Sequence, residues 1–187
     1  YTMAPAVAKA AILSGVAQTS ISDWDAYEED LRNRLGLDDK FIRLVMEKAK
    51  NSPKRVVFNE ADNYKILKAA QIVLDEGIAI PILLGSAKKI KSLNEEYSLG
   101  LEDVEIIDTK SNDVPRLLEY VDSYYKSRQR KGVGYNEARR LLLNRDYYGP
   151  MMVKMGDADA YVTGAMVKYP RAVKPVIEIL GLKDNAR

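Results

Sequence analysis

A cluster of basic residues is the first feature of this sequence that could do chemistry. Between residues 122 and 145 the chain carries seven basic side chains and only two acidic ones. The basic residues are Lys126, Arg128, Arg130, Lys131, Arg139, Arg140 and Arg145. Such a concentration of guanidinium and ammonium groups suits phosphate or another anion. The alternative is an ordinary solvent-exposed helix surface.

Arg128 differs from the other members of this cluster in its helical phase. The pattern predicts a helix over Val114–Arg130, with an apolar stripe formed by Val114, Leu117, Leu118, Val121 and Tyr125. Arg128 follows Val114 by 14 positions, which is almost a whole number of turns at ~100° per residue. Arg128 should therefore leave the helix on the side that faces the core. An arginine directed that way needs an anion or a carboxylate as its partner.

A second candidate site follows the last predicted strand. Thr163 and Gly164 end this strand, and Pro170 stands where the next helix should begin. In α/β proteins, ligands bind beyond the carboxyl ends of the strands, and helix N-termini favour anions. Lys168, Arg171 and Lys174 follow closely in the sequence. The alternative is a strand–loop–helix turn that binds nothing.

Several kinds of chemistry are excluded by composition or disfavoured by pattern. The chain has no His and no Cys, which excludes Ser-His-Asp triads, thiolate nucleophiles and most zinc sites. Asp157 and Asp159 could form an acid–base pair, but a helix end followed by a polar turn is the favoured interpretation. We therefore predict no catalytic residue and no metal ligand in this chain.

Length and charge place further bounds on function. The chain has 187 residues, and its 29 Lys and Arg against 27 Asp and Glu give a net charge of +2. This balance argues against a dedicated nucleic-acid binder. No apolar run reaches 18 residues, and no signal peptide is visible. We expect no membrane association and a cytoplasmic location.

The periodicity divides the chain into a helical N-terminal part and an α/β part. Helices are expected over Ala4–Ser14, from a capping box at Ser22, and over Asp39–Lys50. Strands are then expected at Arg55–Asn59, Ile78–Leu84, Val104–Ile107 and Tyr161–Thr163. Pro81 favours an edge position or a bulge for the second strand. Helices between the strands predict βαβ units and a mostly parallel sheet, in a three-layer α/β/α fold preceded by an all-helical tail.

Several long segments resemble known families. RVVFNEADNYKILKAAQIVLDEGIAIPILLG, YYKSRQRKGVGYNEARRLLLNRDYYGPMMVKMGDADAYVTGA and the following PxxxKP are similar to the N-terminal part of a phosphate acetyltransferase domain. APAVAKAAILSGVAQ and DWDAYEEDLRNRL resemble the last helices of a bacterial malic enzyme domain. Together they resemble the junction of two-domain NADP-dependent malic enzymes. The resemblance implies that residues 1–35 end the malic enzyme domain, 36–51 form a helical linker, and 52–187 begin an incomplete acetyltransferase-like domain.

The resemblance also implies ligands and site residues. The parent would oxidise malate to pyruvate with NADP and Mg²⁺ or Mn²⁺ bound in its malic enzyme domain, while acetyl-CoA or CoA would bind the acetyltransferase-like domain. The family's first arginine matches Arg128, and its second matches Lys174, which keeps the charge but loses the bidentate fork. Thr163 and Gly164 match the loop before the second arginine. The catalytic Ser, Arg and Asp of the family belong to its C-terminal half and have no counterpart here.

Three functions fit this resemblance. The favoured one is an acetyl-CoA-binding regulatory domain of a malic enzyme. The alternatives are an active phosphate acetyltransferase and a domain that holds a homo-oligomer together, the last being compatible with regulation.

Overall fold

The computed structural model describes residues 3–34, 40–111 and 113–182. The chain forms two compact units, Tyr1–Lys48 and Ala49–Arg187. The predicted boundary between residues 35 and 36 falls on residues 35–39, outside the described ones. Within the described ranges, no helix has the length and apolar character needed to cross a membrane.

The described part of the first unit is helical, as predicted. It contains α1 (Met3–Leu13), α2 (Trp24–Arg34) and most of α3 (Lys40–Asn51). Lys9 Nζ lies 4.9 Å from the ring centre of Trp24, which links α1 to α2 by a cation–π contact. The predicted capping residue, Ser22, was wrong by one position. At the start of α2, the Asp23 side chain accepts a hydrogen bond from the backbone N–H of Ala26 at 3.0 Å.

The second unit is built on a four-stranded parallel sheet. Its strands are β1 (Lys54–Asn59), β2 (Ala79–Leu84), β3 (Glu105–Ile107) and β4 (Ala160–Val162), in the order β3-β2-β1-β4. The chain therefore steps from β1 to β2 and β3 on one side and returns to β4 on the other. This reversal makes a topological switch point between β1 and β4, where the carboxyl ends of strands leave room for a ligand.

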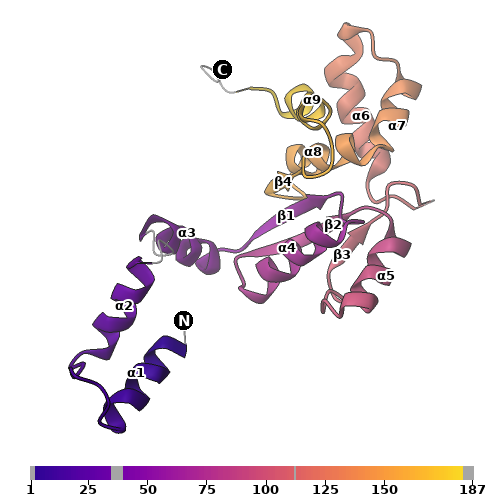
Figure 1. The fold of residues 1–187 in the computed structure, drawn as a ribbon. Coiled ribbons are helices and arrows are strands. Elements are labelled where there is room, and N and C mark those ends of the chain that lie inside the picture. Colours follow the sequence, from indigo (N-terminus) through magenta and orange to yellow (C-terminus); the bar gives the residue numbers. More distant parts are fainter. Residues whose placement is uncertain (1–2, 35–39, 112, 183–187) are drawn as a thin grey trace. The chain divides into compact units, whose positions relative to one another are not determined.

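Helices cover both faces of this sheet, which confirms the predicted three layers. Successive residues of a strand point to opposite faces, so Val57 joins one apolar cluster and Phe58 the other. On the Phe58 face lie α4 (Tyr64–Asp75) and α5 (Ala87–Tyr97). On the Val57 face lie α6 (Leu117–Arg128), α7 (Tyr135–Leu142), α8 (Arg145–Met155) and α9 (Tyr169–Leu180). The short helix η1 (Gln129–Lys131) directly follows α6. Figure 1 shows the two groups of helices on either side of the strands.

Pro81 corrects one expectation about the sheet. The second strand is neither an edge nor bulged, because β2 lies between β1 and β3 in unbroken register. Pro81 pairs with Val56 on the β1 side, but β3 begins opposite Ile82. A missing N–H is tolerated at Pro81 because β2 has only one neighbouring strand at that level.

The α6 helix differs from its predicted pattern. It begins at Leu117 rather than Val114, because Arg116 adopts a left-handed backbone with φ of 51°. Leu118 is 63% exposed instead of buried. The buried face is formed by Tyr120, Val121 and Tyr124, so two tyrosines fill positions that an apolar pattern does not predict.

Candidate functional site

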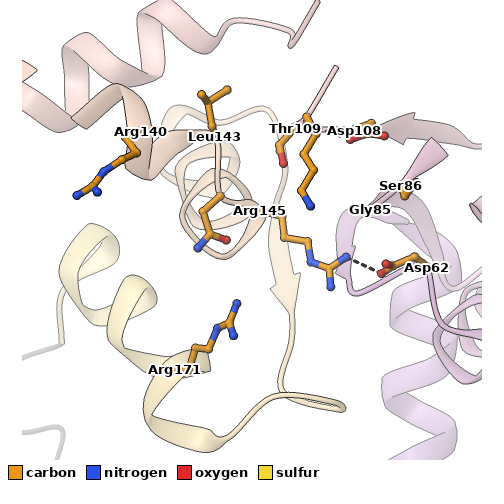
Figure 2. A pocket seen from close by; sticks show the side chains of 11 residues that line it. Asp62, Gly85, Ser86, Asp108, Thr109, Arg140, Leu143, Arg145 and Arg171 are labelled. Atoms are coloured by element: carbon orange, nitrogen blue, oxygen red, sulfur yellow. Dashed lines mark hydrogen bonds and ion pairs between the residues drawn. The ribbon is translucent and has the colours of Figure 1, made fainter. Parts of the chain in front are cut away.

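A cavity of about 560 Å³ lies at the carboxyl ends of three parallel strands. The turns after β1, β2 and β3 supply Asp62, Gly85, Ser86, Asp108, Thr109 and Lys110. The opposite wall comes from the α7–α8 turn and α9, through Arg140, Leu143, Asn144, Arg145 and Arg171. Figure 2 shows these residues around the open space. The cavity thus occupies the place where α/β sheets bind ligands.

Backbone constraints hold the strand side of the cavity. Gly85 lets two turns approach closely, because a Cβ there would lie only 3.0 Å from the backbone N of Asp62. The Asp108 carboxylate accepts bonds from the backbone N–H of Ala87 at 3.1 Å and of Lys110 at 2.9 Å. These bonds fix the loop after β3 against the start of α5.

Two arginines enter the cavity from different helices, each bound to a carboxylate. Arg145, at the start of α8, donates from Nη1 to Asp62 Oδ1 at 2.5 Å. Arg171, in the first turn of α9, donates from Nε to Asp146 Oδ2 at 3.3 Å. Figure 2 shows both guanidinium groups reaching into the same space. Each of them keeps further N–H groups with which it can bind an anion.

A buried polar network lies beneath Arg171. Asn59 Nδ2, at the end of β1, lies 2.9 Å from Asp146 Oδ1, 2.8 Å from the hydroxyl of Tyr161 and 3.0 Å from that of Thr163. Burial raises the pKa of Tyr161, so its phenol stays protonated. This network joins β1, β4 and α8 at the switch point of the sheet.

Glu60 is a functional candidate that the sequence alone did not single out. It follows β1 directly, is only 2% exposed and has a left-handed φ of 59°. Its Oε2 accepts a bond from the backbone N–H of Met166 at 3.2 Å, whereas its buried Oε1 has no hydrogen-bond partner among the residues that the structure describes. Backbone strain and an unpaired buried carboxylate oxygen are features that concentrate at functional sites.

The structure places two of the predicted ligand residues together, beside Glu178. Arg128 leaves α6 on the core side, as its phase predicted, and donates from Nη2 to the backbone carbonyl of Glu178 at 2.7 Å. Lys174 Nζ lies 3.9 Å from Glu178 Oε1. The group that Arg128 contacts is thus a backbone carbonyl oxygen of α9, and its expected role in binding a ligand stays a prediction.

The two loop residues directly follow β4. Thr163 belongs to the buried network, and Gly164 has a left-handed φ of 96°. Among the described residues, however, the cavity lining includes neither of them, nor Arg128 or Lys174. Of the basic cluster, Arg140 and Arg145 line the cavity. Only the fold could select these two, because the cluster spans several elements.

Asp157 and Asp159 have separate structural partners, which supports the turn interpretation over an acid–base pair. Asp157 accepts bonds from the Tyr120 hydroxyl and from Arg116. Asp159 accepts one from the backbone N–H of Arg55 at 2.8 Å.

Known proteins resemble this chain over most of its length. An NAD-dependent malic enzyme from Rhizobium meliloti is 40% identical, and an NADP-dependent malic enzyme from Salmonella typhimurium is 34% identical. Each match covers 98% of this chain but only 24% of the relative, so the chain spans about a quarter of their length. The solved structure of a phosphotransacetylase from Staphylococcus aureus covers 79% of this chain and 44% of its own, with a TM-score of 0.70 and 27% identity.

The family profile named Phosphate acetyl/butaryl transferase matches residues 40–187. This range holds the whole parallel sheet and every residue of the cavity. The chain belongs to the phosphate acetyl/butaryl transferase family.

Proposed function

We propose that this chain is the acetyl-CoA-binding regulatory and assembly domain of an NADP-dependent malic enzyme. The similarity to malic enzymes runs through both units, whereas the acyltransferase family profile begins at residue 40. The malic enzyme relatives include both NAD- and NADP-dependent proteins. The preference for NADP is therefore tested separately, by comparing the rates of malate oxidation by the full-length protein with NAD and with NADP.

The observation that carries the proposal is the cavity lined by arginines at the strand ends. Four basic residues line it (Lys110, Arg140, Arg145 and Arg171) against two acidic ones, Asp62 and Asp108. Coenzyme A carries phosphate groups, and a cationic recess at the carboxyl ends of parallel strands is suited to hold them. Binding there would regulate the parent enzyme if the ligand favours one of its conformations, with a typical coupling of about 1–3 kcal/mol.

The test is malate oxidation by the full-length protein with and without acetyl-CoA, together with direct binding of acetyl-CoA. We expect binding and a change in rate or in the apparent affinity for malate. Free CoA and acetate, added separately, control for the two halves of the ligand. If acetyl-CoA neither binds nor alters malate oxidation, the regulatory function is refuted.

A second candidate is an active phosphate acetyltransferase, which the family membership and the phosphotransacetylase structure favour. In this reaction phosphate attacks the thioester carbonyl of acetyl-CoA, acetyl phosphate forms, and CoA leaves as its thiol. The assay is acetyl phosphate formation by the full-length protein. A clear enzyme-dependent rate would make this domain a second active site, and no rate in a protein that still oxidises malate would refute the activity.

The assembly role is supported by apolar side chains that are exposed around α9. Ile177, Leu180 and Leu182 are each more than 40% exposed, and Tyr169 is 76% exposed. Such rings and aliphatic side chains are common at protein interfaces. Deleting residues 52–187 should lower the number of subunits per oligomer, obtained by dividing the mass in solution by the mass of one truncated subunit. An unchanged number of subunits would count against this role.

A further inference from the structure

The two arginines of the cavity are held in a way that leaves their outer nitrogen atoms available. Asp146 is nearly buried, with its side chain 6% exposed, and it uses both carboxylate oxygens. Oδ1 accepts from Asn59 Nδ2 at 2.9 Å, and Oδ2 accepts from Arg171 Nε at 3.3 Å. Because the bond to Arg171 takes its Nε–H, the four N–H groups on the two Nη atoms remain for another partner.

Arg145, on the same wall of the cavity as Arg171, is anchored in a similar manner. Its Nη1 binds Asp62 Oδ1, and the Nη2 group remains. Asp62 is in turn fixed by its place in the turn between β1 and α4, beside Gly85. Two guanidinium groups from α8 and α9 thus face one cavity (Figure 2), and each is paired with a carboxylate, Asp62 for Arg145 and Asp146 for Arg171. A carboxylate that orients an arginine lowers the entropy lost when the arginine binds an anion.

We infer that Arg145 and Arg171 together bind a phosphate or pyrophosphate group in this cavity, and that Asp146 is the positioning residue for Arg171. The inference rests on the proposed function only in assigning that group to coenzyme A. It also changes the expected site, because the cation of α9 that contacts the ligand becomes Arg171 rather than Lys174.

Lys174 provides a matched control for Arg171. Both residues lie on α9, and their side chains are 70% and 69% exposed. Lys174 is paired with Glu178, whereas Arg171 lines the cavity. Arg171→Gln and Lys174→Gln remove one positive charge each from the same helix, so a general effect of charge would alter binding equally in the two variants.

The experiment measures binding of three probes to the full-length protein by calorimetry. The probes are inorganic pyrophosphate, acetyl-CoA and pantetheine, which has the CoA arm without its phosphates. We expect Arg171→Gln and Arg145→Gln to weaken pyrophosphate and acetyl-CoA binding by about tenfold or more, since each removes a charge-assisted hydrogen bond. Lys174→Gln should change pyrophosphate binding less than twofold, and pantetheine binding should stay the same in both arginine variants.

The role of Asp146 is tested by a double-mutant cycle. Asp146→Asn should weaken pyrophosphate binding severalfold in the wild-type background and have no further effect once Arg171 is Gln. A residue with only a structural role would give the same loss in both backgrounds. Arg171→Lys keeps the charge but cannot contact Asp146 and a ligand together through a planar fork, so it should not restore full affinity. Circular dichroism of each variant verifies that it is folded.

The outcomes separate this inference from the proposed function. If pyrophosphate and acetyl-CoA both bind equally to the wild type and to both arginine variants, the inference is overturned and the proposed function stands. Pyrophosphate binding that needs both arginines, without any binding of acetyl-CoA, supports the subsite and refutes the assignment to coenzyme A. Equal losses in Arg171→Gln and Lys174→Gln, or no pyrophosphate binding to the wild type, overturn the inference.

Discussion

A methyl group added at Gly149 would occupy space that the Tyr161 ring now fills. Gly149 lies inside α8, where helix propensity alone predicts that Gly149→Ala stabilises the protein by about 1 kcal/mol. The tertiary structure predicts the opposite sign. An ideal Cβ at Gly149 would lie 2.2 Å from Cε2 and 2.6 Å from Cδ2 of Tyr161.

The size of the effect follows from these distances. Carbon atoms pack best about 3.5–4.0 Å apart, so the ring must move by roughly 1 Å or more. Overpacking of this kind costs about 1–3 kcal/mol. The movement also disturbs the 2.8 Å contact between the Tyr161 hydroxyl and Asn59 Nδ2, which is worth about 1 kcal/mol. After the gain in helix propensity is subtracted, we expect a net loss of about 1–3 kcal/mol in the free energy of unfolding.

The assay is urea unfolding followed by near-ultraviolet circular dichroism, which reports on packed tyrosines. The control places the same substitution in a Tyr161→Ala background, where the ring is absent. There, Gly149→Ala should be neutral or stabilising, by up to about 1 kcal/mol. A single Gly149→Ala variant that is as stable as the wild type, or more stable, would refute the reasoning.

Three further predictions concern the packing around α6. Asp157→Asn should lower the free energy of unfolding by about 1–2 kcal/mol, because the Tyr120 hydroxyl and the Arg116 guanidinium lose a charged acceptor. An unchanged midpoint of thermal unfolding would contradict this prediction. Burial, with a carboxylate nearby, raises the pKa of Tyr124 to about 12, above the ordinary value near 10. The folded state therefore holds this proton more tightly, so the free energy of unfolding should fall as pH rises from about 10 to 12. This fall with pH should be less steep in Tyr124→Phe, and an equally steep fall in the two proteins would contradict the prediction. Val121→Ala should lower the free energy of unfolding by about 2 kcal/mol, and Leu118→Ala should lower it by less than about 0.5 kcal/mol, as measured by urea unfolding. Similar losses in the two variants would mean that the buried face of α6 is wrongly assigned.

The order of helices and strands was largely predictable because each element carries its own local signal. Continuous apolar runs predicted β1 and β2, and in the structure the Asn63 side chain caps α4 by accepting a bond from the backbone N–H of Lys65. The errors arose where tertiary packing overrides local preference. Arg116 takes a left-handed backbone while it binds Glu119 and Asp157, and this shortens α6.

For the candidate site, the sequence predicted the type of ligand, an anion, but not the residues that line the cavity. Composition excluded histidine and cysteine chemistry. The loop at Thr163 and Gly164 indicated an anion site at the carboxyl end of a strand, and the basic cluster was a separate candidate. Which cations line a cavity depends on contacts between residues far apart in the sequence. Arg145 meets Asp62 across 83 positions, and Asp146 meets Asn59 across 87.

The sequence by itself therefore determined the fold class, the family resemblance and the type of charge at the site. Helical periodicity placed Arg128 on the inner side of α6, but only the tertiary structure showed that a backbone carbonyl of α9 binds it there. The same structure brought Arg145 and Arg171 to one cavity and revealed the buried Glu60 with its unpaired oxygen. Burial and pairing depend on what packs against a side chain, and residue spacing within one element carries no information about that neighbour.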